Sequence, residues 1–201
     1  MMKRNLKHMC SIPKILLWKA LYRNRISANI RSIIGKHVSL EIESNAMCKL
    51  SRIHVEAYGT IAVRRGAKLF MGNSVYINKN CTITCHQKIE IGAHCSFGPN
   101  LCIFDHDHRF SENGQIRGQY RCGDVQIGDN CWFGGNVIIL RGTVVGDNCV
   151  IGAGTVLSGV IPPNSLVVQG RQLQIKPLSA SPGRGLQKEQ MEGNWKDIGV
   201  C

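Results

Sequence analysis

A six-residue repeat from Ile127 to Ile161 constrains the fold of this chain more than any other feature of its sequence. The first position of each hexad is large and apolar, the second is mostly glycine, and the fifth is small or β-branched. The first positions are Ile127, Phe133, Ile139, Val145, Ile151 and Leu157. An α-helix does not explain this pattern, because at 3.6 residues per turn a period of six spreads the apolar residues over every face. A strand that turns a corner every six residues does explain it.

Such a repeat predicts a three-sided solenoid. Each hexad forms one flat side, three sides make a coil, and coils stack through backbone hydrogen bonds about 4.8 Å apart. The apolar first positions then fill the axis, the small fifth positions fit near the corners, and glycines and Asp-Asn pairs supply the turns. We therefore expect an all-β fold, a parallel β-helix.

The repeat is less regular before Ile127. Residues 38–69 contain short β-prone stretches that indicate irregular early coils, and a clear frame begins at Met71. Between residues 105 and 124 the repeat stops, and the sequence is polar and aperiodic. We predict that residues 105–124 form a loop that protrudes from the solenoid, where functional residues often lie.

Basic residues are concentrated at the N-terminus. The chain has a net charge of +12, and residues 1–36 contain nine Lys or Arg and no Asp or Glu. Residues 11–26 begin with Ser11 as an N-cap and are predicted to form a helix. This helix could close the open end of the solenoid, could lie on an anionic membrane surface, or could do both. The expected organisation is a basic helical segment at 1–36, the β-helix domain at 37–175 and a loosely held tail at 176–201.

The ten cysteines do not indicate a disulfide scaffold in a chain of this length. Four of them occupy fifth positions of hexads, where a thiol acts as a small hydrophobic group: Cys81, Cys95, Cys131 and Cys149. Buried thiols predict a reducing compartment. The sequence also lacks a long uncharged apolar segment and a secretory signal, so we expect a cytoplasmic protein.

Two other kinds of partner are disfavoured. The motif Cys81-x-x-x-Cys85-His86 lacks the paired Cys-x-x-Cys of zinc sites, so no metal is expected. The basic N-terminus lacks interleaved aromatic residues and any nucleic-acid-binding motif, so no nucleic acid is expected either.

Three segments carry a resemblance to a known family: Ile127-Gly-Asp-Asn-Cys-Trp132-Phe-Gly-Gly, Val150-Ile-Gly-Ala-Gly-Thr155 and Ile161-Pro-Pro-Asn164. They resemble the hexapeptide-repeat acyltransferases with a left-handed parallel β-helix. Within that family they resemble the galactoside and maltose O-acetyltransferases and related polysaccharide O-acetyltransferases. The resemblance covers roughly residues 70–170 and alone implies the left hand of the helix.

The function implied by the resemblance is acetyl transfer from acetyl-CoA to a sugar hydroxyl. We expect a homotrimer whose sites lie between neighbouring subunits and a carbohydrate acceptor from bacterial capsule, exopolysaccharide or O-antigen synthesis. The basic N-terminus adds a possible peripheral association with the inner face of the membrane.

The resemblance also implies catalytic residues. In galactoside-type enzymes the catalytic histidine lies eight residues after the Asn of a Pro-Asn pair, which leads here from Asn100 to His108. A substrate-contacting asparagine thirty residues earlier corresponds to Asn78. An alcohol needs a base to attack a thioester near neutral pH, so we expect His108 to be the general base, with His106 the next candidate.

The same gap-free offset places the implied donor contacts. Gly135 corresponds to a small residue near the thioester, and Ala153 and Ser158 correspond to contacts with coenzyme A. Trp132 matches the aromatic of the family's Trp-Ile-Gly segment and is expected to form a wall of the acyl-CoA or acceptor site. Packing on the outer face is the alternative role for Trp132.

Three other functions stay open. The first is acetyl transfer to another acceptor, such as serine, an amino sugar or a xenobiotic. The second is a metal protein like the γ-type carbonic anhydrases, which share the solenoid, although the close pair His106-x-His108 differs from their His-x-x-x-x-His spacing. The third is a non-catalytic trimer, which the coincidence of Asn78 and His108 disfavours.

Overall fold

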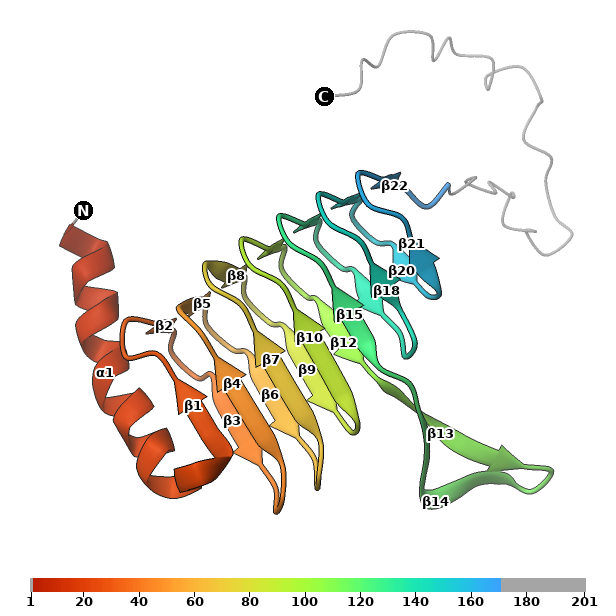
Figure 1. Ribbon diagram of the computed structural model, residues 1–201, viewed down its shortest axis with the longest axis horizontal. Coiled ribbons are helices and arrows are strands. Elements are labelled where there is room, and N and C mark those ends of the chain that lie inside the picture. The colour runs from red at the N-terminus through yellow and green to blue at the C-terminus, as the bar shows by residue number, and fades with distance from the viewer. Residues whose placement is uncertain (1, 171–201) are drawn as a thin grey trace, which may run out of the picture. The chain divides into compact units, whose positions relative to one another are not determined.

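The computed structural model of the chain describes residues 2–170, with the backbone alone over residues 2–8. The predicted tail at 176–201 lies outside the described residues, as do residues 171–175 of the predicted domain. Three parallel sheets of seven, seven and six strands wind a β-helix. Figure 1 shows how its coils stack along one axis. The predicted β-helix is therefore confirmed.

Successive strands of the chain enter the first, second and third sheets in turn, so each coil has three sides. The first sheet contains β1 (Ile26–Ala28), β4 (Met47–Leu50), β7 (Lys68–Met71), β10 (Lys88–Ile91), β15 (Val125–Ile127), β18 (Val144–Val145) and β21 (Val160–Ile161). The second contains β2 (Ile33–Ile34), β5 (Ile53–Val55), β8 (Val75–Ile77), β11 (Ser96–Phe97), β16 (Trp132–Phe133), β19 (Val150–Ile151) and β22 (Leu166–Val167). The third contains β3 (Ser39–Ile42), β6 (Thr60–Val63), β9 (Thr82–Cys85), β12 (Cys102–Phe104), β17 (Ile138–Ile139) and β20 (Val156–Leu157).

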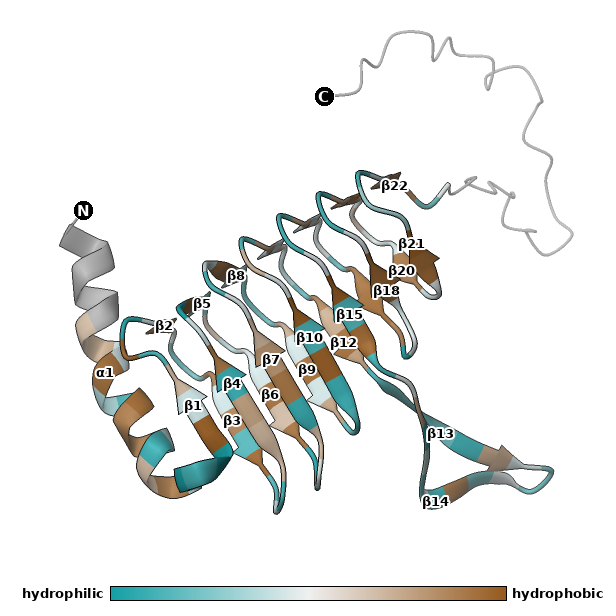
Figure 2. Cartoon of the chain, in the orientation of Figure 1, coloured by the Kyte–Doolittle hydropathy of each residue, from teal (hydrophilic) through white to brown (hydrophobic). Residues whose placement is uncertain are grey.

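The core follows the hexad pattern. All six apolar first positions from Ile127 to Leu157 are buried, with at most 4% of any of them exposed. Phe97 and Phe133, from adjacent coils, stack with ring centroids 4.6 Å apart. Apolar and polar bands alternate along the strands in Figure 2, as expected for strands with one face inward. The four fifth-position cysteines are likewise buried and free.

The fourth position of the hexad makes the corners. Asn100, Asn130, Asn136 and Asn148 have φ between 57° and 60°, in the left-handed region. Asparagine tolerates this conformation better than other non-glycine residues, and Gly154 takes the same place in a later coil with φ of 70°. The Asp-Asn pairs of the sequence therefore mark corners, as predicted.

The early coils, predicted as irregular over residues 38–69, are fully paired in the three sheets but differ in length. Ile26 pairs with Cys48, Cys48 with Leu69, and Leu69 with Ile89, so each coil is slightly shorter than the one before it. None of these coils is a whole number of hexads long, which hides the repeat in the sequence. Later, Ile127 pairs with Val145, and that coil is three hexads long.

The N-terminal helix is longer and earlier than predicted. The helix α1 spans Met2–Tyr22 and is followed by the 3₁₀ turn η1 (Arg23–Arg25), whereas the sequence predicted a helix over residues 11–26. The β-helix begins at Ile26, inside the segment predicted as N-terminal, because β1 and β2 belong to its first coil. No helix within residues 2–170 is long and apolar enough to cross a membrane.

One side of α1 closes the open end of the β-helix (Figure 1), where it contacts β1 and β2. Ile15 and Trp18 are buried there. Side chains of α1 also form hydrogen bonds with the backbone edge of the first coil. Ser11 Oγ accepts the N–H of Ile34 at 2.8 Å, and the Tyr22 hydroxyl donates to the carbonyl of Leu40 at 2.6 Å. The predicted cap is confirmed, and it protects an edge that would otherwise be open to further strand pairing.

The segment predicted as an aperiodic loop is a β-hairpin. β13 (His106–Ser111) and β14 (Gly114–Cys122) pair antiparallel, with an irregularity between His108 and Arg109. The hairpin leaves the β-helix between β12 and β15 and projects from it in Figure 1. Ile89 pairs with Val125, a step twice as long as the later step from Ile127 to Val145. The hairpin therefore adds the length of one full coil without shifting the later frame.

Candidate functional site

The hairpin is anchored by a buried carboxylate at its base. The Asp105 side chain is fully buried. Its oxygens accept the backbone N–H groups of His86 and Gln87, each at 2.7 Å, and the Cys85 thiol at 3.4 Å. These donors come from the end of β9 in the preceding coil. Asp105 thus fixes where the hairpin begins relative to the corner between the third and first sheets.

Two imidazoles lie beside this carboxylate. His106 Nδ1 is 3.3 Å from Asp105 Oδ1, and the His106 side chain is only 11% exposed. The rings of His106 and His86 have centroids 3.9 Å apart. Burial of its ring, followed by the neighbouring His106, lowers the pKa of His86. The neutral form of the His86 ring is therefore favoured.

His108, the predicted base, lies on the same strand and is exposed. It pairs with Tyr120 across the hairpin, with ring centroids 5.0 Å apart, and lies 6.3 Å from the ring of His106. The Gln115 amide nitrogen is 2.7 Å from His108 Nδ1. Because a side-chain amide can turn to donate or accept, Gln115 can hold either tautomer of the neutral ring. The opposite nitrogen, Nε2, is then available for proton transfer.

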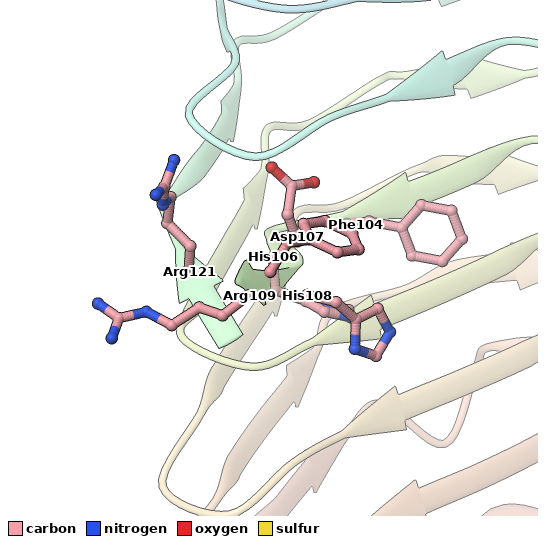
Figure 3. A pocket seen from close by; sticks show the side chains of 7 residues that line it. Phe104, His106, Asp107, His108, Arg109 and Arg121 are labelled. Carbon is pink, nitrogen blue, oxygen red and sulfur yellow. The ribbon is translucent and has the colours of Figure 1, made fainter. Parts of the chain in front are cut away.

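His106 and His108 both line two hollows. One, of about 530 Å³, is lined by Phe104, His106, Asp107, His108, Arg109, Phe110 and Arg121. Figure 3 shows Arg109 and Arg121 reaching to one side of this hollow and the imidazole of His108 to the other. The second, of about 580 Å³, is lined by Glu43, Arg64, Arg65, Thr84, His86, His106, His108 and Tyr120. These volumes are in the range of small-molecule sites.

The hairpin is tied to a later coil as well. Asp107 forms an ion pair with Arg141, which lies at the same corner between β17 and β18. The hairpin is therefore attached to the preceding coil by Asp105 and to a later coil by Asp107. These two attachments restrict the position of His108.

Three other predicted residues lie at a different corner, between the second and third sheets. Gly135 and Ala153 occupy equivalent places in successive coils, and the N–H of Gly154 bonds the carbonyl of Gly135 at 2.8 Å. Asn78 is half-buried and lies at the same corner. Its N–H bonds the carbonyl of Phe97, and the N–H of Gly98 bonds the carbonyl of Phe133, so Asn78 lies two coils before Gly134. Asn78 is therefore about 10 Å along the axis from the Gly134–Gly135 turn.

The remaining two predicted residues lie elsewhere. Trp132 is on the outer face of the second sheet and is 50% exposed. Ser158 is exposed just after β20, at the corner from which the hairpin also projects. From Gly135 the chain runs along one side of the coil to the next corner at Arg141, about 20 Å when extended. One chain consequently does not gather His108, Asn78 and the Gly135–Ala153 pair into a single site.

The described residues also contain buried thiols. Burial raises the pKa of the Cys95 thiol to about 12, so it is not a thiolate near neutral pH. No three His, Cys, Asp or Glu side chains within residues 2–170 are arranged to hold a metal ion.

Sequence reasoning missed three residues that line the second hollow together with the predicted base: His86, Tyr120 and Arg64. The sequence suggests His86 only as part of a cysteine motif. A signal was present, because His86 follows the third side of one coil and His106 follows the third side of the next. The contact between the two rings can be predicted only when the length of that coil is known, and the pairing of Phe104 with Thr84 sets that length.

Comparison with known proteins agrees with the repeat and the fold. Residues 124–158 match the family model described as the hexapeptide repeat of succinyl-transferase. The chain is 36% identical over 111 residues to a galactoside O-acetyltransferase of Lactococcus lactis, covering 55% of this chain and 53% of the relative. It is 33% identical over 99 residues to the galactoside O-acetyltransferase of Escherichia coli, covering 49% of each. The chain thus spans about half the length of the curated relatives it matches.

Solved structures show the same fold. A galactoside acetyltransferase in complex with coenzyme A aligns with a TM-score of 0.50 and 23% identity, covering 82% of this chain and 75% of that one. A hexapeptide-repeat acetyltransferase from Vibrio cholerae aligns with a TM-score of 0.50 and 20% identity, covering 82% of both chains. The predicted resemblance is confirmed: residues 124–158 carry the hexapeptide repeat, the chain forms a parallel β-helix, and about half of it is similar in sequence to galactoside O-acetyltransferases.

Proposed function

We propose that this protein is an acetyl-CoA-dependent O-acetyltransferase that acts on a sugar hydroxyl. The observation that carries the proposal is the position of His108 in a chain related to galactoside O-acetyltransferases. Its imidazole is exposed on an anchored hairpin and lines two hollows large enough for a small substrate. The fold neighbour solved with coenzyme A supports acetyl-CoA as the donor.

The reaction needs few groups. His108 Nε2 accepts the proton of the acceptor hydroxyl as its oxygen attacks the thioester carbonyl. The tetrahedral oxyanion is stabilised by an N–H donor, for which we assign the backbone at Gly134–Gly135. When the C–S bond breaks, the protonated His108 returns the proton to the leaving thiolate of coenzyme A. Asn78 orients the acceptor hydroxyl, and Trp132, Ala153 and Ser158 line the donor slot.

The arrangement of the corners supports a homotrimer with shared sites. His108 projects from one corner, while Asn78 and Gly135 lie at another, so these groups meet most simply when the hairpin of one subunit reaches the neighbouring corner of the next. Val150 and Leu166 continue the exposed column above Trp132 and give the outer face of the second sheet an apolar strip. Such a strip is suited to contact with another subunit.

For the acceptor, we propose a sugar of capsule, exopolysaccharide or O-antigen synthesis. The galactoside specificity in the names of the relatives supports a sugar. We place the enzyme in the cytoplasm at the inner face of the membrane, because the basic N-terminus would favour a lipid-linked acceptor. Serine, an amino sugar and a xenobiotic are the competing acceptors.

The test is a thiol-release assay with acetyl-CoA over a panel of these acceptors. His108→Asn should lower kcat by about 10²–10⁴-fold, since general-base catalysis contributes that much. His94→Asn is the matched control: His94 is an exposed histidine outside both hollows, at a φ of 60° that asparagine tolerates. Full activity of His108→Asn would reject His108 as the base and make His106 the residue to test. Turnover confined to a non-sugar acceptor would reject the sugar.

A further inference from the structure

The outward side of α1 is apolar. Met9, Leu16, Leu17 and Leu21 are 67%, 50%, 56% and 59% exposed, although the helix already buries Ile15 and Trp18 on its other side. At 3.6 residues per turn these exposed residues share one side of the helix with further exposed residues that include Pro13 and Ala20, and none of them is charged. We call this set the outer face of α1: Met9, Pro13, Leu16, Leu17, Ala20 and Leu21.

This pattern differs from that expected for a helix that only caps a solenoid, because α1 carries apolar residues on its outward side as well as its inward side. A surface helix normally turns its apolar stripe to the core and its polar residues to water. In α1 the inward side includes polar anchors, such as Ser11 and Tyr22, and the outward side carries the leucines. A contiguous exposed apolar face marks a binding surface.

Exposed basic residues occur on α1, on η1 and in the first coil. Lys19 and Arg23 lie on α1 and η1, and Arg31 and Lys36 lie in the first coil that α1 covers. Residues 1–36 contain no Asp or Glu. A second copy of this chain docked on the same face would bring two strongly basic segments together, so the charge favours an anionic partner.

We propose that the outer face of α1 binds the surface of an anionic lipid bilayer. The helix lies along the interface with its leucines in the boundary between headgroups and acyl chains, and Lys19, Arg23, Arg31 and Lys36 lie near lipid phosphates. The inward side of α1 stays on the first coil, so the β-helix is attached to the membrane by its N-terminal end.

This inference deepens the membrane location in the proposed function but does not depend on the chemistry at His108. The hairpin leaves the β-helix between β12 and β15, and α1 covers β1 and β2. Lipid binding can be measured without acetyl-CoA, and acetyl transfer to a water-soluble sugar can be measured without lipid. Failure of one therefore does not imply failure of the other.

The experiment is co-sedimentation of the full chain with vesicles of phosphatidylcholine alone and with added phosphatidylglycerol. Binding is expected to the anionic vesicles and should weaken as salt screens the charges. The double variant Leu17→Glu and Leu21→Glu should bind at least about tenfold more weakly. Lys19→Gln should lower binding about fivefold, the equivalent of ~1 kcal/mol.

Met47→Glu is the matched control, because Met47 on β4 is also exposed (47%) but lies off α1. Circular dichroism reports whether each variant folds, and Leu16→Gln replaces the double variant if that one does not. Three results would overturn the proposal: equal binding to both kinds of vesicle, undiminished binding of the folded outer-face variants, or a change in oligomeric size in these variants while vesicle binding persists.

Discussion

At the scale of single residues, the candidate site depends on Asp105. This fully buried carboxylate joins the start of the hairpin to the backbone of the preceding coil, and it lies beside His106. A buried carboxylate is stable only while its hydrogen-bond donors are present, and buried N–H groups in turn need an acceptor. The positions of His106 and His108 therefore depend on Asp105. In the proposed reaction Asp105 does not contact the substrate.

We predict that Asp105→Asn destabilises the protein by about 2 kcal/mol or more. The amide removes the negative charge and turns an N–H₂ group toward one of two backbone donors, and hydrogen bonds to charged groups are worth roughly 1.5–3 kcal/mol. Urea unfolding measures the change. Asp107→Asn is the control, because its ion pair with Arg141 is exposed and contributes at most about 1 kcal/mol. Equal stability of the two variants would contradict the anchoring role of Asp105.

At the scale of the coil, stacking distance is set by the second position of the hexad. A Cβ on Gly134 would lie 2.6 Å from the backbone nitrogen of Ala153, whereas a Cβ on Gly135 would meet its nearest atoms, in Pro99, at 3.5 Å. The two adjacent glycines therefore have different structural roles. Gly134 allows two coils to stack, and Gly135 leaves an ordinary van der Waals contact at the corner.

We predict that Gly134→Ala lowers the Tm clearly while Gly135→Ala does not. Forcing a methyl group into the backbone of the next coil costs about 1–3 kcal/mol, which corresponds to roughly 2–12 °C for a chain of this size. Gly135→Ala should change the Tm by less than about 2 °C and, if Gly135 lies near the thioester, raise the KM for acetyl-CoA. Calorimetry and donor titration check the two effects separately. A stable Gly134→Ala protein would show that the coils can move apart.

At the scale of the whole molecule, the separation of His108 and Asn78 on two corners predicts that sites are shared between subunits. Co-expression of a His108→Ala chain with an Asn78→Ala chain should then restore activity. In randomly mixed trimers about a quarter of the sites combine an intact histidine from one subunit with an intact asparagine from the next. Mixed trimers should have about that fraction of wild-type kcat. Each variant expressed alone is the control, and activity no greater than their average would place both residues in one subunit's site.

The sequence predicted the regular part of this fold well because the hexad pattern is local. From Ile127 to Leu157 each apolar position faces the axis and each Asn at a corner takes the left-handed conformation, so the residue type alone indicates the geometry. The prediction was less accurate where coil length changes. The coils before Ile89 differ in length from one to the next, which conceals their repeat. The hairpin was predicted as a loop because its strands are exposed on both faces, so apolar and polar residues do not alternate along them.

By itself, the sequence determined the three-sided coil, the inward residues and a protruding segment with two histidines, since each follows from periodicity or from its interruption. Only the tertiary structure decided which groups meet. His86 reaches His106 because one coil stacks on the next, Asp105 is buried because β9 supplies its donors, and the leucines of α1 face outward because Ile15 and Trp18 occupy the end of the core. Contacts between coils depend on the exact length of each turn, and the composition of a hexad does not encode that length.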